Sequence, residues 1–254
     1  MKPQTTSLPA APKTIQILAH RGLVSEFVPE NTLKAFTDAI EAGADVIETD
    51  VQVSNDEVAL IFHDATLLRL AGINKQVSQF SLAELDQVDI GHGKRIATLE
   101  QALLAFPKTR FNLDIKCEGA IAPTVKTIEK LNAHDRVLIS SFSDRRRLKT
   151  LALLSKPTRT SAGVSKVLKL YLASKLGLGS WFSKLSADID VLQVPIRKGL
   201  LRLDTARFVK SCTTAGLEIH YWTINSSSEM IRLRDLGASG IVSDRCDLAK
   251  ATIH

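Results

Sequence analysis

Residues 14–53 decide the fold, and they read TIQILAHRGLVSEFVPENTLKAFTDAIEAGADVIETDVQV. Residues 14–19 form a short, mostly apolar run, which predicts a strand. Asn31-Thr32 can cap a helix whose apolar residues recur at helical spacing until Gly43 ends it. A second apolar run then covers residues 46–53. A strand, a helix and a second strand in this order form the parallel crossover unit of α/β proteins.

A hairpin is predicted directly after this unit. Ser54 to Glu57 form a turn that is too short for a helical crossover, and the apolar run 58–62 follows at once. We therefore expect that run to return antiparallel and to carry His63-Asp64 at its far end. Residues 64–97 are predicted to be an insertion with a short helix that begins at the capping box Ser81-Leu82-Ala83-Glu84.

Eight strands are expected apart from the returning arm of the hairpin. They begin near residues 15, 46, 111, 137, 158, 191, 218 and 240, with helical segments between them. This alternation predicts a single (β/α)8 TIM barrel over residues 14–254. An open doubly wound sheet is the alternative, but Arg21-Gly22 stands where its glycine-rich dinucleotide fingerprint would follow the first strand.

Composition narrows the class of protein. Hydrophobic residues make up 44% of the chain and charged residues 24%, which is typical of a soluble domain with a sizeable core. No apolar run is long enough to span a membrane. Residues 1–13 contain three prolines and no apolar signal core, so we expect a flexible N-terminal tail. The three cysteines are far apart, which favours a reducing compartment such as the cytoplasm.

Polar side chains are predicted on the inner face of two barrel strands. Period-two alternation places Glu48 and Asp50 on one face, and likewise Asn112, Asp114 and Lys116. Parallel strands are usually apolar on both faces, and unpaired charges there would cost several kcal/mol each. A divalent cation bound by Glu48, Asp50 and Asp114 would remove that cost, and all-oxygen ligation suits Mg²⁺ or Ca²⁺. The alternative is a buried Asp114–Lys116 ion pair, with Glu48 and Asp50 solvated at a strand end.

Two histidines and two cations complete the predicted site. His20 and His63 both lie at strand ends, and each has a charged neighbour. Imidazole titrates near neutral pH, so the two histidines are candidates for general acid and base. Arg21 and Lys116 are candidates for binding an anion, since arginine can contact two phosphate oxygens at once.

The motifs resemble those of the glycerophosphodiester phosphodiesterases, part of a wider superfamily of phospholipase-C-like TIM-barrel phosphodiesterases. The resemblance covers roughly residues 15–249 in the family's order. The most specific matching pieces are His20-Arg21-Gly22, Pro29-Glu30-Asn31-Thr32, Glu48-Thr49-Asp50, His63-Asp64, Asn112-Leu113-Asp114-Ile115-Lys116, Trp222-Thr223-Ile224-Asn225 and Ser243-Asp244-Arg245.

The resemblance implies a TIM barrel that uses a divalent cation to hydrolyse glycerophosphodiesters to glycerol 3-phosphate and an alcohol. By position it implies metal ligands at Glu48, Asp50 and Asp114, an acid–base pair at His20 and His63, phosphate contacts from Arg21 and Lys116, and a pocket wall at Trp222. Asp114 stands where the family usually has glutamate. Hydrolysis of lysophospholipids and phosphate binding without turnover are the alternatives, and the two histidines favour an enzyme.

A basic segment is not explained by this site. The net charge is +6, and residues 145–187 contain ten Lys or Arg and no Asp or Glu. The apolar residues Val164, Val167, Leu168 and Tyr171 predict an amphipathic helix over residues 164–176. The simpler interpretation is an ordinary barrel helix with solvated lysines. The alternative is that residues 164–185 contact an anionic membrane through lysines, Trp181 and Phe182, whereas nucleic acid fits poorly.

Overall fold

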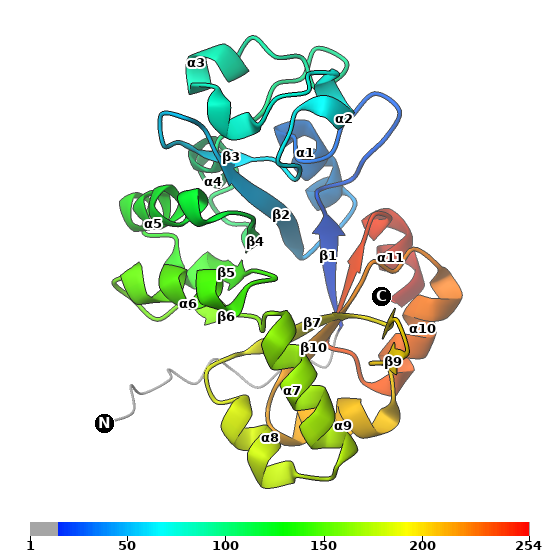
Figure 1. Cartoon of the computed structure of the whole chain (residues 1–254). Helices are drawn as coiled ribbons and strands as arrows, with labels where there is room; N and C mark the ends of the chain where they lie inside the picture. The colour runs from blue at the N-terminus through cyan, green and yellow to red at the C-terminus, as the bar shows by residue number, and fades with distance from the viewer. Residues whose placement is uncertain (1–14, 254) are drawn as a thin grey trace.

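A closed parallel barrel is the centre of the computed structural model, which describes residues 15–253 (Figure 1). The predicted tail, residues 1–13, lies outside the described residues. The barrel strands are β1 (Gln16–His20), β2 (Val46–Val53), β4 (Arg110–Ile115), β5 (Val137–Ser140), β6 (Arg159–Thr160), β7 (Val191–Pro195), β10 (Glu218–Trp222) and β11 (Gly240–Ser243). Their hydrogen-bonded order is β6-β5-β4-β2-β1-β11-β10-β7, and a parallel bridge between Ser161 and Val191 joins the two ends.

Helices surround the barrel, one after each strand or its extension. They are α1 (Leu33–Glu41), α4 (Leu99–Ala105), α5 (Ile121–Lys130), α6 (Asp144–Leu153), α7 (Val164–Lys175), α9 (Ala206–Thr214), α10 (Ser227–Leu236) and α11 (Cys246–Ile253). A further helix, α8 (Gly179–Leu185), follows α7, and β8 (Arg197–Lys198) pairs with β9 (Leu201–Arg202) in a small hairpin. Short 3-10 turns are η1 (Val77–Gln79), η2 (Glu118–Ala120) and η3 (His134–Arg136). The predicted TIM barrel is confirmed, and the open-sheet alternative is wrong.

The predicted hairpin and insertion are both present. Strand β3 (Ala59–Ile61) pairs antiparallel with β2, as the short turn required. The insertion contains α2 (Leu68–Ala71), η1 and α3 (Leu82–Leu85), and the Ser81 capping box starts α3. It lies at the top of Figure 1, on the opposite side of the barrel from α7 and α8. A small apolar cluster of its own, which includes Leu60, Phe62 and Leu85, holds it against β3.

The side chains of the barrel strands divide as the alternation predicts. Leu113 and Ile115 belong to the apolar core between strands and helices, whereas Asn112 and Asp114 point into the barrel. The outward-facing apolar side chains therefore fix the strands against the helices, and the same strands hold polar side chains on the inner face of the barrel. None of the helices within residues 15–253 has the length and apolar character that spanning a membrane requires.

The turn after β1 depends on Gly22, which has φ +88° and lies against α1. An added Cβ would meet backbone and side-chain atoms of Ala35 at 2.7 Å.

Gly72 has a similar φ of +71° but open space around it, so it is the matched control for a substitution at Gly22. Gly72→Ala should cost about 1–2 kcal/mol of backbone strain. Gly22→Ala should lower the free energy of unfolding by roughly 1–3 kcal/mol more, because of the collision. Equal losses in urea titrations of the two variants would contradict this.

Candidate active site

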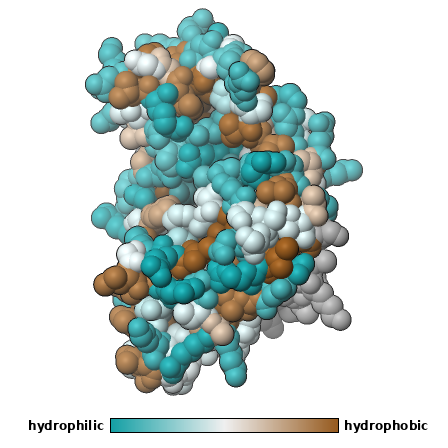
Figure 2. Space-filling model, turned by 90° about the vertical axis from the view of Figure 1, so that its right-hand side faces the viewer, coloured by the Kyte–Doolittle hydropathy of each residue, from teal (hydrophilic) through white to brown (hydrophobic). Residues whose placement is uncertain are grey.

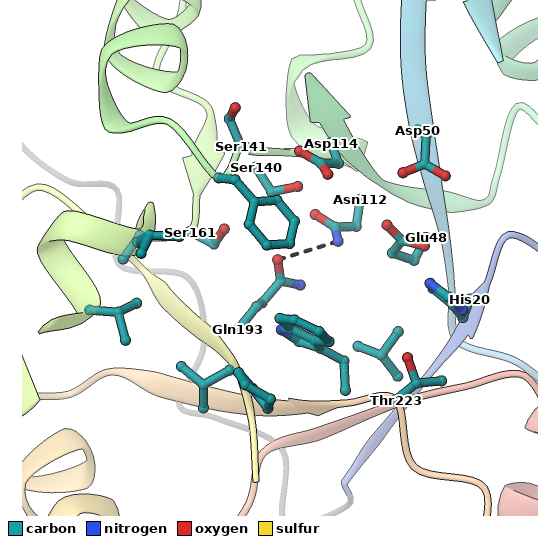
Figure 3. A pocket seen from close by; sticks show the side chains of 18 of the residues that line it. His20, Glu48, Asp50, Asn112, Asp114, Ser140, Ser141, Ser161, Gln193 and Thr223 are labelled. Carbon is teal, nitrogen blue, oxygen red and sulfur yellow. Dashed lines mark hydrogen bonds between the residues drawn. The ribbon is translucent and has the colours of Figure 1, made fainter. Parts of the chain in front are cut away.

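A pocket opens at the carboxyl ends of the barrel strands, where TIM-barrel enzymes carry their active sites (Figure 3). Its volume is about 320 Å³. All the site residues predicted from the sequence line it: His20, Arg21, Glu48, Asp50, His63, Asp114, Lys116 and Trp222. The fold therefore brings together residues that are up to two hundred positions apart in the sequence.

Strand register explains why the acidic residues meet. His20 on β1 pairs with Glu48 on β2, and Glu48 pairs with Asn112 on β4. One step further along, Asp50 pairs with Asp114. Neighbouring strands lie about 4.8 Å apart, so in-register side chains on the inner face are close neighbours. Figure 3 shows these side chains projecting into the same cavity.

Two positively charged side chains hold Asp50 in its ionised form. Lys116 Nζ lies 3.0 Å from Asp50 Oδ1 and 3.0 Å from Asp114 Oδ2, and Arg21 Nε lies 3.2 Å from Asp50 Oδ2. Burial raises the pKa of Asp50, but Lys116 and Arg21 outweigh it and hold that pKa below its usual value. The Asp114–Lys116 ion pair expected as one alternative is therefore present. Glu48 and Asp50 are buried, however, and not solvated as that alternative supposed.

Two carboxyl groups in the pocket each have one oxygen without a hydrogen-bond partner. Glu48 Oε2 and Asp114 Oδ1 are buried and have no hydrogen-bond partner. Burial, then the charge of Asp50, raises the pKa of Glu48 to about 8. Burial also raises the pKa of Asp114, against the effect of Lys116. Buried oxygens of this kind are costly unless a cation or donor meets them.

The carboxyl groups do not form a ready-made metal site. Among residues 15–253, no three His, Cys, Asp or Glu side chains are already grouped so as to hold a metal ion. The ammonium of Lys116 stands between Asp50 and Asp114. The donor chemistry still fits a hard cation, because two buried carboxylate oxygens are unpartnered. The metal-ligand assignment from the sequence stays a prediction.

His20 is oriented by an acidic residue from the last strand's end. Its Nδ1 lies 2.6 Å from Oδ1 of Asp244, and Asn225 Nδ2 donates to the other oxygen of Asp244 at 2.7 Å. Burial lowers the pKa of His20, but the hydrogen bond to Asp244 and the charge of Glu48 together raise it above its usual value. A carboxylate on one ring nitrogen leaves the other nitrogen free for proton transfer.

His63 is held by a network that crosses the pocket rim. Its Nδ1 lies 2.7 Å from Asp64 Oδ1, and Arg69 Nε on α2 donates to Asp64 Oδ2 at 2.6 Å. Arg69 also donates to Glu30 at 2.7 and 2.9 Å, and Arg21 Nη1 donates to Glu30 at 3.0 Å. The insertion thus couples the orientation of His63 to that of Arg21.

The opposite wall of the pocket is apolar. Trp222 packs edge-on against Phe142 at 5.9 Å between ring centroids, and Lys116 Nζ lies 5.7 Å from the Phe142 ring centre. The other apolar residues that line the pocket are Ala162, Val164, Val167, Val194, Pro195, Leu203 and Val242. Beside it, Asn112 Nδ2 donates to Gln193 at 3.3 Å (Figure 3). One side of the cavity thus suits a phosphate and the other an apolar group.

Sequence reasoning assigned no role to Asp244, Glu30 or Arg69. Glu30 and Asp244 stand inside two of the quoted motifs, and Arg69 lies five residues after Asp64, but only the folded chain shows what each one contacts. The pairing of an acidic residue with each candidate histidine was visible in sequence only for His63, whose partner Asp64 is adjacent.

A TIM barrel whose carboxyl-end pocket brings together histidines, acidic groups, an arginine and a lysine has the arrangement of a barrel enzyme's active site. Comparison with known proteins narrows the class. The model of the glycerophosphoryl diester phosphodiesterase family matches residues 20–248. The chain belongs to this family and is a phosphoric diester hydrolase.

Individual relatives agree with this family. The probable glycerophosphodiester phosphodiesterase 2 of Mycobacterium tuberculosis is 40% identical over 92% of this chain and 88% of its own length. A lysophospholipase D of Rattus norvegicus is 25% identical over 89% of this chain and 82% of its own. The structure of an Oleispira antarctica phosphodiesterase in complex with the product sn-glycerol-3-phosphate has a TM-score of 0.79 and 26% identity, with 94% and 97% of the chains covered.

Proposed function

We propose that this protein hydrolyses glycerophosphodiesters to sn-glycerol 3-phosphate and an alcohol. The observation that carries the proposal is the pair of histidines in one cavity, each bonded to an aspartate and both beside Arg21 and Lys116. The Oleispira antarctica relative, whose solved complex holds sn-glycerol-3-phosphate, supports the same product. A protein that only binds phosphate, without turnover, would not need two histidines that are each hydrogen-bonded to an aspartate.

Each side chain then has a separate part in the reaction. Arg21 and Lys116 neutralise the phosphate and orient it, because charge-assisted hydrogen bonds in a partly buried site are strong. One histidine removes a proton from the nucleophile, which is either water or the 2-hydroxyl of the glycerol group. The other histidine protonates the leaving alcohol. Asp64 and Asp244 orient the two imidazole rings.

A divalent cation is part of the proposal. Glu48, Asp50 and Asp114 would hold it, and their oxygen ligands suit Mg²⁺ or Ca²⁺. The support is the unpartnered oxygens of Glu48 and Asp114 and the raised pKa of both groups. When bound, such a cation stabilises negative charge that develops on the phosphate.

A lysophospholipid is the second candidate substrate. The apolar wall around Phe142 and Trp222 favours it, because an acyl chain needs apolar surface beside the phosphate site. A relative named lysophospholipase D adds support. Both substrates require the same cleavage of the bond between phosphate and head-group alcohol.

A two-product assay tests this function. Purified protein would be given glycerophosphocholine or lysophosphatidylcholine, with Mg²⁺, Ca²⁺ or EDTA, and both choline and glycerol 3-phosphate would be measured. We expect both products from glycerophosphocholine and an activity loss of about 10²-fold or more with EDTA, since a catalytic cation contributes several kcal/mol. Choline alone from the lysolipid would identify the second substrate. If glycerophosphocholine fails to give either product, the proposed function is contradicted. If EDTA leaves the activity unchanged, the proposed role of a divalent cation is contradicted.

A further inference from the structure

Helix α7 is apolar on both of its sides. Leu170 and Tyr171 are buried, and the Tyr171 ring packs against Phe208 of α9 at 5.8 Å. On the opposite side, Leu168, Leu172 and Leu176 are 45%, 48% and 70% exposed. Their spacing of four residues places them in one row along the helix. The predicted helix is present, but the prediction is wrong about its apolar face in part, because Val164 and Leu168, two of the four residues assigned to that face, are exposed.

The exposed row begins at the first residue of α7 and continues beyond the end of the helix. At the start, Val164 is exposed and also lines the active-site pocket. After the helix, Leu178 is exposed, and Trp181 on α8 is 64% exposed. Figure 2 shows brown, apolar side chains at the lower edge of the molecule, at the level of α7 to α9 in Figure 1. We call the row Val164, Leu168, Leu172, Leu176, Leu178 and Trp181 the apolar ridge.

Lysines flank the apolar ridge. On a helix with 3.6 residues per turn, Lys169 and Lys175 fall on either side of the leucine row. Neither these two nor Lys184 has an acidic partner within residues 15–253, whereas Lys166 is paired with Asp188. Residues 145–187 contain no acidic residue, so no carboxylate from this segment offsets the charge.

This combination fits a lipid surface better than a second copy of the chain. In a twofold dimer the same patch meets itself, so lysines would face lysines across the contact. An anionic bilayer offers acyl chains for leucines, an interfacial layer for an indole ring and negative headgroups for lysines. Phe182, named with Trp181 in the sequence, is only 2% exposed and packs inward.

We propose that the apolar ridge docks this protein on the surface of an anionic phospholipid bilayer. The leucines and Trp181 enter the headgroup and acyl boundary, and Lys169, Lys175 and Lys184 contact the headgroups. Because Val164 begins the ridge and lines the pocket, docking brings the pocket mouth next to the bilayer. Membrane attachment goes beyond the proposed function and does not require turnover.

Vesicle binding by the full chain tests this proposal. We expect flotation with phosphatidylcholine vesicles that contain phosphatidylglycerol, weak binding to pure phosphatidylcholine, and loss of binding as salt rises. The double variant Leu172→Ser, Trp181→Ser should bind about tenfold more weakly or worse. The double variant Lys169→Glu, Lys175→Glu should bind anionic vesicles at least fivefold more weakly. Leu104→Ser and Lys126→Glu, on exposed positions of α4 and α5, are the matched controls.

Several results would overturn the proposal. One is no binding to anionic vesicles at low salt, and another is equal loss in the ridge and control variants. A third is a dimer, seen in sedimentation velocity, that the Leu172→Ser, Trp181→Ser variant no longer forms, together with no vesicle binding. That result would assign the ridge to self-association instead. Turnover of a soluble diester should be unchanged in that variant, so failure of the proposed function would be seen separately. Both side chains are exposed, and circular dichroism checks that the fold is kept.

Discussion

Replacing His20 by alanine is expected to lower kcat by roughly 10²-fold or more, because a positioned acid or base contributes about that much. His20 lies in the pocket, and Asp244 holds its Nδ1 at 2.6 Å. His63→Ala should lower kcat by a similar factor. Steady-state kinetics with glycerophosphocholine give the measurement. His92→Ala is the control, since His92 is exposed and outside the pocket. Near-normal kcat in both pocket variants would contradict the acid–base assignment.

The contact between Asp244 and His20 allows the role of His20 to be tested a second way, through the pH dependence of the rate. The hydrogen bond to Asp244 raises the pKa of His20, so Asp244→Asn should lower that pKa. Whether His20 acts as acid or as base, the limb of the pH–rate profile that reports it should then move to lower pH. A merely structural role for Asp244 would reduce activity without moving either limb.

Local pattern was enough to predict the barrel. Most strands contain a short apolar run, and the turn at Ser54–Glu57 is too short for a crossover, so chain geometry alone requires the antiparallel β3. Period-two alternation also predicted which side chains of β4 face inward. These features depend on residues that are close in sequence, where sterics and burial leave few alternatives.

Contacts between distant segments could not be predicted in the same way. The Asp244–His20 contact joins residues 224 positions apart, and no local pattern indicates which acidic residue meets which histidine. The exposed face of α7 was misjudged for a related reason. Its leucines at positions 168 and 170 are chemically alike, and only packing against α8 and α9 decides which of them is buried.

The electrostatics of Glu48 point to a test of the cation. Glu48 Oε2 is buried without a partner, and burial raises the pKa of this residue to about 8. At neutral pH without a cation, the carboxyl group is therefore largely protonated. A glutamine has the same shape and is also neutral, so Glu48→Gln should leave the stability of the cation-free protein nearly unchanged. Binding of a cation requires the carboxylate, and glutamine lacks it.

Glu48→Gln should therefore separate binding of the cation from folding. For the unaltered protein, Mg²⁺ or Ca²⁺ at about 100-fold above Kd should raise Tm by roughly 5–10 °C, since such binding adds about 2.7 kcal/mol. In Glu48→Gln this rise should disappear, and kcat should fall by about 10²-fold or more. Differential scanning calorimetry with the cation or with EDTA measures the first effect. Glu41→Gln, at the exposed end of α1, is the matched control. A full cation-induced rise in Glu48→Gln would remove Glu48 from the ligand set, and a large loss of stability in EDTA would make its role structural.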